Sequence, residues 1–264
     1  MSEFLVMGFP ASSDANLRGE FATLLSELAE VDLGVAPAAS YAELAGKLHD
    51  GSAQLAWLSP IPYIALAHTG TVSPLVYNER ATKHYASALL VQADSHVKRI
   101  ADLRGARAAW VDKHSAAGYV VPRIELARAG VDPRSELGEQ NFYGSHEAVA
   151  RAIASREADF GATFAHREGS TFAGPFTHPD VADRVRVLTT FGKIPSDLIV
   201  ARSDLAMDLR VRLTRALRAM NADEIGRRVI RELFEIERFR LLDAEAYESL
   251  QAIARNARDQ GLLE

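Results

Sequence analysis

Residues 112–122 read Asp-Lys-His-Ser-Ala-Ala-Gly-Tyr-Val-Val-Pro, and the rest of the chain is organised around them. The apolar run Ala108–Val111 before them predicts a buried strand, and a helical pattern that ends at Gly130 follows them. Ser115 therefore stands where a helix begins. A helix start leaves backbone N–H groups unpaired and carries partial positive charge, so it can hold an anion without Lys or Arg. An ordinary N-cap serine explains the same residue, so the stretch alone leaves both interpretations open.

Length and composition are those of an ordinary folded protein. The 264 residues are 48% hydrophobic and 25% charged, and their number fits one large domain or two lobes of ~100–150 residues each. The net charge of −5 gives no basic surface for nucleic acid or an anionic membrane. The sequence has no cysteine, which excludes disulfides, thiolate nucleophiles and cysteine-based zinc sites.

The first residues, Met1–Pro10, do not have the pattern of a secretory signal. They lack a basic front, a long apolar region and a small-residue cleavage site, and they predict a first strand instead. No run of 18 apolar residues occurs that would predict a membrane span. We therefore expect either a cytoplasmic protein or a periplasmic or cell-surface one whose leader is missing from this sequence.

Apolar runs of four to eight residues alternate with helical patterns along the first three quarters of the chain. This alternation predicts an α/β fold with largely parallel sheets, and from Asp204 onward the pattern predicts helices. In parallel sheets, ligands bind beyond the carboxyl ends of the strands. The polar candidates follow predicted strands or lie in turns: Ser12, Ser59, Ser115, His146, His166 and Asp197.

Four stretches in order resemble one family. They are residues 85–91 (Tyr-Ala-Ser-Ala-Leu-Leu-Val), residues 112–122, residues 144–150 with 158–162, and residues 194–202 (Ile-Pro-Ser-Asp-Leu-Ile-Val-Ala-Arg). Their order and approximate spacing, over about residues 4–220, are similar to those of the phosphate/phosphonate-binding solute receptors of ABC importers. That family has the type II periplasmic-binding-protein fold.

The resemblance implies two α/β sandwich lobes joined by two crossing strands, residues 85–91 and 197–201. Lobe 1 would comprise residues 1–91 plus 199–264, and lobe 2 residues 92–198, with a ligand cleft between them. Binding would favour a closed state by hinge motion in the crossing strands.

The family's ligand site is partly kept. The resemblance carries an aromatic residue over to Tyr85, a histidine to His146 and an acid to Asp197. The family's Ser-Thr-Ser at the helix start is here Ser115, Ala116 and Ala117, so two hydroxyl donors are missing. A family tyrosine falls on Leu58, next to Ser59, and a glutamate that holds a ligand's amino group falls on His166. We therefore expect an oxyanion ligand, phosphonate- or phosphate-like, and disfavour an aminophosphonate.

The resulting hypothesis is a non-catalytic solute-binding protein that captures a small anion for ABC-type import. It implies a permease and an ATPase as partners, a monomeric chain, no cofactor and no metal. The alternative is a cytoplasmic sensor module of the same fold that acts in signalling or regulation. An enzyme on this fold, for instance in pyrimidine precursor synthesis, ranks last because the Cys/His chemistry it would need is absent.

Two sharper chemical interpretations find little support. Ser115, His146 and Asp197 could be imagined as a catalytic triad, but triads are recognised by geometry, and no Gly-x-Ser-x-Gly motif occurs. Four histidines could be imagined as metal ligands, but none has the His-x-x-x-His spacing: His84, His114, His146 and His166.

Overall fold

The computed structural model describes residues 4–80, 85–192 and 194–263 and divides into two compact units. The described residues within 1–81 and 196–251 form unit 1, and those within 82–195 and 252–264 form unit 2. The sequence-based boundaries differ at three places. Residues 85–91, expected in lobe 1, group with unit 2, and so do the residues after Gln251. Residues 196–198, expected in lobe 2, group with unit 1.

Unit 1 contains a six-stranded sheet in the order β12-β4-β11-β3-β1-β2. Its strands are β1 (Phe4–Pro10), β2 (Asp32–Ala38), β3 (Leu55–Leu58), β4 (Val72–Glu79), β11 (Leu198–Arg202) and β12 (Arg238–Arg240). β1 is parallel to β2 and β3, whereas β11 is antiparallel to β3 and β4. The sheet is thus mixed, and the expectation of a largely parallel sheet was wrong. The chain re-enters unit 1 directly into β11, without the crossover helix that makes neighbouring strands parallel.

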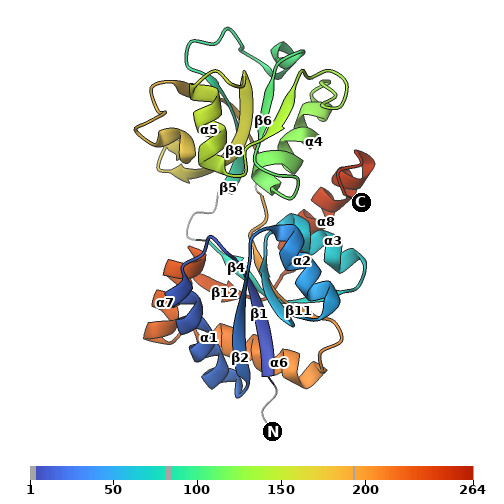
Figure 1. Cartoon of the computed structure of the whole chain (residues 1–264), viewed down its shortest axis with the longest axis vertical. Coiled ribbons are helices and arrows are strands. Elements are labelled where there is room, and N and C mark those ends of the chain that lie inside the picture. Colours follow the sequence, from blue (N-terminus) through green and yellow to red (C-terminus); the bar gives the residue numbers. More distant parts are fainter. Residues whose placement is uncertain (1–3, 81–84, 193, 264) are drawn as a thin grey trace. The chain divides into compact units, whose positions relative to one another are not determined.

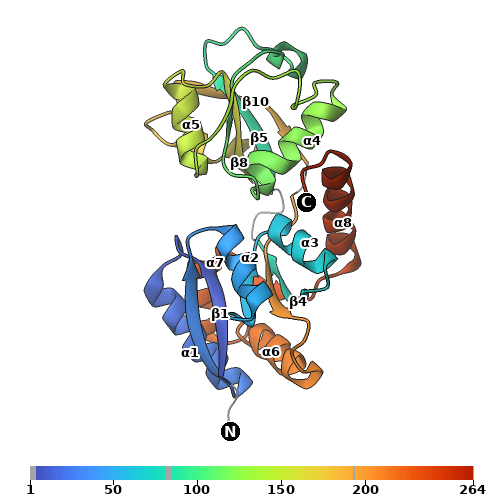
Figure 2. The ribbon, with the colours of Figure 1, turned by 45° about the vertical axis from the view of Figure 1, so that its right-hand side comes forward.

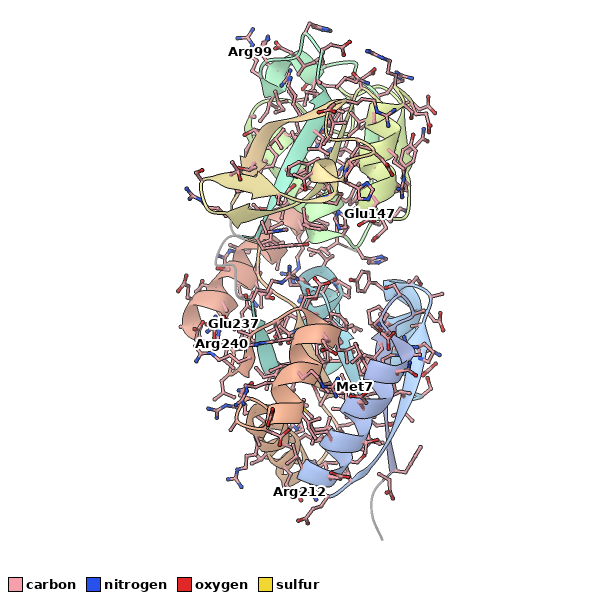
Figure 3. All side chains as sticks on the ribbon, turned by 90° about the vertical axis from the view of Figure 1, so that its left-hand side faces the viewer. Met7, Arg99, Glu147, Arg212, Glu237 and Arg240 are labelled. Atoms are coloured by element: carbon pink, nitrogen blue, oxygen red, sulfur yellow. The ribbon has the colours of Figure 1, made fainter. Side chains whose placement is uncertain are left out.

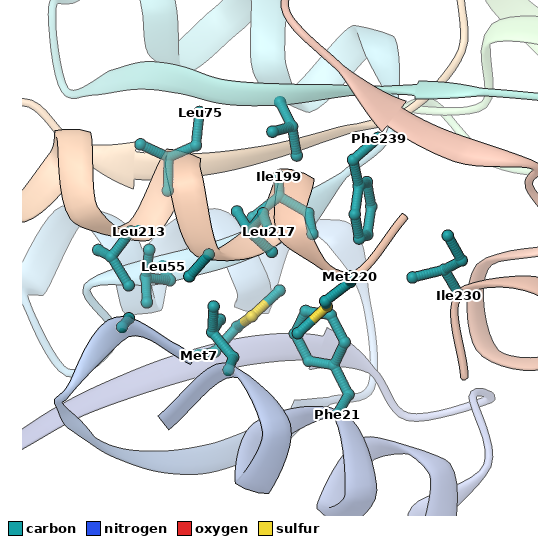
Figure 4. Packing of buried hydrophobic residues seen from close by; sticks show 14 of the residues in the cluster. Met7, Phe21, Leu55, Leu75, Ile199, Leu213, Leu217, Met220, Ile230 and Phe239 are labelled. Atoms are coloured by element: carbon teal, nitrogen blue, oxygen red, sulfur yellow. The ribbon is translucent and has the colours of Figure 1, made fainter. Parts of the chain in front are cut away.

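Helices cover both faces of the unit 1 sheet (Figure 1, Figure 2). On one face lie α1 (Ala15–Ala29), α6 (Met207–Ala219) and α7 (Glu224–Phe234), and on the other lie α2 (Tyr41–Asp50) and α3 (Pro60–His68). The core under α1, α6 and α7 is a closed cluster of aliphatic and aromatic side chains (Figure 4), in which Phe21 meets the ring of Phe234 at 5.0 Å. Burying a large apolar side chain contributes about 1.5–3 kcal/mol, so this layer fixes the ends of the strands that carry polar groups.

Unit 2 contains a sheet in the order β10-β5-β8-β6-β7, with β9 paired to β8. The strands are β5 (Tyr85–Gln92), β6 (Ala108–Trp110), β7 (Gln140–Phe142), β8 (Phe160–Glu168), β9 (Thr171–Ala173) and β10 (Val185–Phe191). β6 is parallel to β7 and β8, and β5 is antiparallel to β8 and β10. α4 (Val121–Arg128) and α5 (His146–Ala154) pack against this sheet (Figure 1).

Two short strands lie where the sequence predicts none. β9 falls in residues 169–180, whose Gly, Pro, Thr and Ser content is typical of a loop, and β12 interrupts the predicted helical region before α8 (Ala244–Asp259). Each has three residues, and each is defined by pairing with a distant strand rather than by its own apolar pattern. Such elements carry too few residues to show a period.

Candidate functional site

Four of the predicted site positions gather at one edge of the unit 2 sheet. Because β6, β7 and β8 are parallel, the segments that follow them begin at the same edge, and β5, being antiparallel to β8, starts there. Tyr85 opens β5, Ser115 follows β6, His146 follows β7 and His166 lies near the end of β8. We call these four residues, with Ala116 and Ala117, the unit 2 cluster.

The turn after β6 is a helix start, as the sequence predicts. Ser115 caps it, and its Oγ accepts a hydrogen bond from the Gly118 N–H at 3.0 Å. The first turn, Ala116–Val120, is a π-helical turn in which the Val120 N–H donates to the Ser115 carbonyl at 3.0 Å. The Ser115 hydroxyl therefore serves the turn itself, and the first backbone N–H groups, at Ala116 and Ala117, are the ones that a helix start could offer to an anion.

Neighbouring strands hold this turn in place. The Ser87 hydroxyl of β5 donates to the Ala117 carbonyl at 2.7 Å, and the Val111 N–H donates to the Gly118 carbonyl at 3.2 Å. Gly118 allows the close approach, because a Cβ at that position would lie 2.3 Å from Cγ2 of Val111. The donors at the helix start are thus fixed by contacts to two strands.

His146 is the first residue of α5, where Glu147, labelled in Figure 3, follows it. Its Nδ1 lies 3.0 Å from Oγ1 of Thr163 and accepts a hydrogen bond from the Phe164 N–H at 3.3 Å. Nδ1 is therefore unprotonated, and the ring proton is on Nε2. Burial lowers the pKa of His146 from 6.5 to about 4, so the ring is neutral at pH 7. Within the described residues no protein group hydrogen-bonds Nε2, and this N–H is a fixed donor.

Aromatic rings line the same edge. Tyr85 stacks on Phe164 at 5.6 Å with an interplanar angle of 19°, and Phe164 stacks on His166 at 6.2 Å. The edge of the His146 ring contacts Phe164 at 5.0 Å. Phe164, which we did not single out from the sequence, thus joins three of the predicted residues through its ring.

Asp197 lies in unit 1, just before β11. Its Oδ2 accepts a hydrogen bond from the Trp57 indole N–H at 3.0 Å, and its Oδ1 lies 3.7 Å from a guanidinium nitrogen of Arg80. The side chain is only 16% exposed, and burial raises the pKa of this carboxyl above its usual value, opposed by Arg80 and Trp57. Arg80 Nε also donates to Oγ of Ser196 at 3.1 Å.

The three other predicted positions in unit 1 differ in what they offer. Ser12 is exposed in the turn after β1. Leu58 is the last residue of β3, and its side chain is fully buried. Ser59 is the N-cap residue of α3, but its hydroxyl caps no backbone N–H. Both stay predicted ligand-binding positions.

Trp57, Asn78 and Arg80 were not among the candidates from the sequence, but they contact Asp197. The sequence places Trp57 in a strand, where core packing is the usual role, and Asn78 and Arg80 in a polar break after a strand. The structure brings all three to Asp197: Asn78 donates its N–H to the Asp197 carbonyl at 2.9 Å. One signal was available, because polar residues that end a buried strand commonly face a ligand in α/β folds. We call Trp57, Ser59, Asn78, Arg80 and Asp197 the unit 1 cluster.

Metal and membrane sites are not found in the described ranges 4–80, 85–192 and 194–263. No group of three or more His, Asp or Glu side chains there is arranged to hold a metal ion, and no helix there has the length and apolar character that crossing a bilayer requires. Of the four histidines weighed as ligands, His84 lies outside the described residues.

These features define a class of protein. The chain belongs to the family of substrate-binding proteins of phosphonate transport, because the family described as "ABC transporter, phosphonate, periplasmic substrate-binding protein" matches residues 8–247. The members are solute-binding proteins and are not catalytic. The resemblance stated from the sequence is thereby confirmed.

Particular relatives place the fold within the type II periplasmic binding proteins. XAC2383 from Xanthomonas citri bound to ATP superposes with a TM-score of 0.83 and 20% identity over 98% of both chains. PhnD1 from Prochlorococcus marinus in complex with methylphosphonate superposes with a TM-score of 0.76 and 17% identity. The superposition covers 97% of this chain and 98% of that chain. The phosphate-import protein PhnD of Mycolicibacterium smegmatis is 26% identical over 170 residues, 59% of this chain and 53% of that protein. The match therefore spans about half the length of this curated relative.

Proposed function

We propose that the protein binds a small phosphorus oxyanion, phosphate or a simple phosphonate, through the unit 2 cluster, and delivers it to an ABC permease driven by an ATPase. The observation that carries this proposal is His146, whose ring is neutral and directs Nε2–H as a donor at the edge where the helix after Ser115 begins. Neutral, fixed donors suit a permanently charged oxyanion, because they bind it without having to exchange protons.

The hydrogen-bond donors of the unit 2 cluster would contact the oxyanion group of the ligand rather than its substituent. Backbone N–H groups at Ala116 and Ala117 and the Nε2–H of His146 supply hydrogen bonds of about 1.5–3 kcal/mol each to a charged acceptor. Because the two alanines add no hydroxyl groups, little in this turn discriminates one phosphorus oxyanion from another. Tyr85 and Phe164 offer ring faces for an apolar substituent such as a methyl group.

The charge of the unit 1 cluster argues against a ligand with an amino group. Asp197 is the acid that a cation would need, but Arg80 lies 3.7 Å from it and neutralises it. This agrees with His166 in the position where the resemblance places a glutamate. Methylphosphonate and phosphate, which the names of two relatives mention, carry no amino group and fit this charge. That one ligand is held by both units, as the resemblance implies, stays a prediction.

Isothermal titration calorimetry with methylphosphonate tests the proposal through His146. The His146→Ala variant is expected to bind about tenfold more weakly or worse, because an N–H to a charged oxygen is lost. His146→Gln, which keeps a side-chain N–H, is expected to recover part of the affinity. His178→Ala serves as the matched control, since His178 lies 61% exposed in another loop. Unchanged affinity in His146→Ala would remove the basis of the proposal.

A further inference from the structure

Thr163 carries a hydroxyl group in an apolar layer of unit 2. It lies in β8 between Gly161 and Ala165, on the face that α5 covers, and its side chain is 0% exposed. Ala165 and Val149 of α5 belong to one hydrophobic cluster beside it. A buried hydroxyl group is costly unless it forms a hydrogen bond, and valine would fill nearly the same space without that cost. The hydroxyl group therefore has a use other than packing.

The one hydrogen-bond partner of the Thr163 hydroxyl, within the part of the chain that the structure describes, is the ring of His146. Its Oγ1 lies 3.0 Å from Nδ1 of that ring. Because Nδ1 also accepts a hydrogen bond from the Phe164 N–H, at 3.3 Å, Nδ1 carries no proton, and the Thr163 hydroxyl is the donor. Of the two hydrogen bonds to Nδ1, the one from Thr163 is the shorter.

These two donors fix the orientation of the His146 ring and the place of its proton. Flipping the ring over would put a carbon atom where Nδ1 lies and leave two buried donors without an acceptor. Moving the proton to Nδ1 would oppose the Phe164 N–H. Hydrogen bonds to Nδ1 also polarise the ring, which strengthens Nε2–H as a donor. Nε2 itself is open to solvent, since it has no partner in the described residues and is not one of their buried unpartnered atoms.

We propose that Thr163 is a positioning residue of the anion site: its hydroxyl group holds the His146 ring in the Nε2–H form and in one orientation. This role rests on the proposed function, because it requires that His146 donates to the ligand. All the groups involved belong to unit 2, and Thr163 itself does not touch the ligand. The role adds to the proposed function a residue that sets affinity through the ring of another residue.

Nitrogen NMR of the His146 ring tests the first step in the intact protein without any ligand. In the wild type at pH 7, separate signals are expected from a protonated Nε2 and an unprotonated Nδ1. Thr163→Val keeps the shape of the side chain and removes the hydroxyl group. It is expected to move the two signals toward each other, because only the longer bond from Phe164 then opposes the other tautomer. Thr163→Ser keeps the hydroxyl group and is expected to keep the wild-type signals.

Calorimetry with methylphosphonate tests the second step. Thr163→Val is expected to bind about fivefold more weakly, as the loss of one hydrogen bond allows, and Thr163→Ser is expected to stay within about twofold of the wild type. Thr214→Val is the matched control, because it removes a hydroxyl group that donates to the Arg210 carbonyl at 2.8 Å in α6 of unit 1. It is expected to change neither the His146 signals nor the affinity.

The outcomes separate this role from the proposed function. Unchanged ring signals or unchanged affinity in Thr163→Val overturns the positioning role, even where His146→Ala binds more weakly and the proposed function stands. Equal losses in Thr163→Val and Thr163→Ser would show that shape matters rather than the hydroxyl group, which also overturns it. If the wild type does not bind methylphosphonate, the proposed function fails and the positioning role fails with it.

Discussion

His146, for which we propose a binding role, also makes stability depend on pH. Two groups of β8, the Thr163 hydroxyl and the Phe164 N–H, hold Nδ1, and burial keeps the ring neutral. Protonation of Nδ1 would place a donor against the Phe164 N–H, and it would put a charge in a buried position. The same burial that makes Nε2–H a fixed donor therefore opposes the charged form.

This histidine predicts a pH dependence of folding. Its pKa is about 4 in the folded protein against 6.5 in the unfolded chain, so the unfolded chain takes up a proton first as pH falls. The neutral His146 ring makes its full contribution to the free energy of unfolding above pH 6.5. Between pH 6.5 and pH 4 this contribution declines by about 1.4 kcal/mol per pH unit. Urea denaturation at pH 7.5, 5.5 and 4.5 is expected to show this decline in the wild type and a shallower one in His146→Gln. Parallel declines would contradict the assignment.

Ser115 is predicted to act on stability rather than on binding. Its hydroxyl accepts the Gly118 N–H, so Ser115→Ala is expected to lower the free energy of unfolding by about 1 kcal/mol. Calorimetry with methylphosphonate is expected to show a change of less than about twofold, because the donors are backbone groups. Ser40→Ala removes the equivalent cap of α2. It is expected to lower the free energy of unfolding by a similar amount and to leave the affinity for methylphosphonate unchanged. A tenfold affinity loss in Ser115→Ala alone would mean that the hydroxyl contacts the ligand.

Among the elements, the turn that joins β6 to α4 depends most on shape. Gly118 lies against Val111, and an added methyl group would come 2.7 Å from Cβ and 2.3 Å from Cγ2 of that valine. Gly118→Ala is expected to cost about 1–3 kcal/mol of stability and to weaken methylphosphonate binding, since the N–H groups of Ala116 and Ala117 would shift. Gly46→Ala, in α2 with open space around it, is expected to raise stability by about 0.4–1 kcal/mol. Equal effects of the two changes would show that the turn tolerates the methyl group.

The elements also show what the sequence could predict. Residues Leu55–Leu58 form β3, and they are recognisable in the sequence because an apolar run bounded by polar and proline residues is a strong local signal. The capping role of Ser115 was predictable because serine is a common N-cap, but the π-helical turn that follows was not, since it depends on contacts to β5 and to Val111, the residue after β6. Asn78 and Arg80 were missed because their partner Asp197 is distant in sequence and pairs with them only through the β4–β11 register.

At the scale of the whole molecule, the four sequence stretches that resemble the family predict the family and the fold class. They do not predict which strands of each sheet run parallel and which run antiparallel. The two sheets are mixed because β11 enters unit 1 from unit 2, and β5 enters unit 2 from unit 1, without a crossover helix. Each unit brings its polar residues to one edge of its own sheet. We propose that the unit 2 cluster binds an anion; in the unit 1 cluster Asp197 and Arg80 form an ion pair at 3.7 Å.

We propose that the protein binds one phosphorus oxyanion per chain. Calorimetric titration of the wild type with methylphosphonate and with inorganic phosphate, beside ethanesulfonate, tests it most directly. We expect one binding site for a phosphorus ligand. We also expect the free energy of unfolding to rise by about 2.7 kcal/mol when the free ligand is at 100 times its Kd. No binding of either phosphorus ligand at millimolar concentration, or tighter binding of ethanesulfonate than of both, would contradict it.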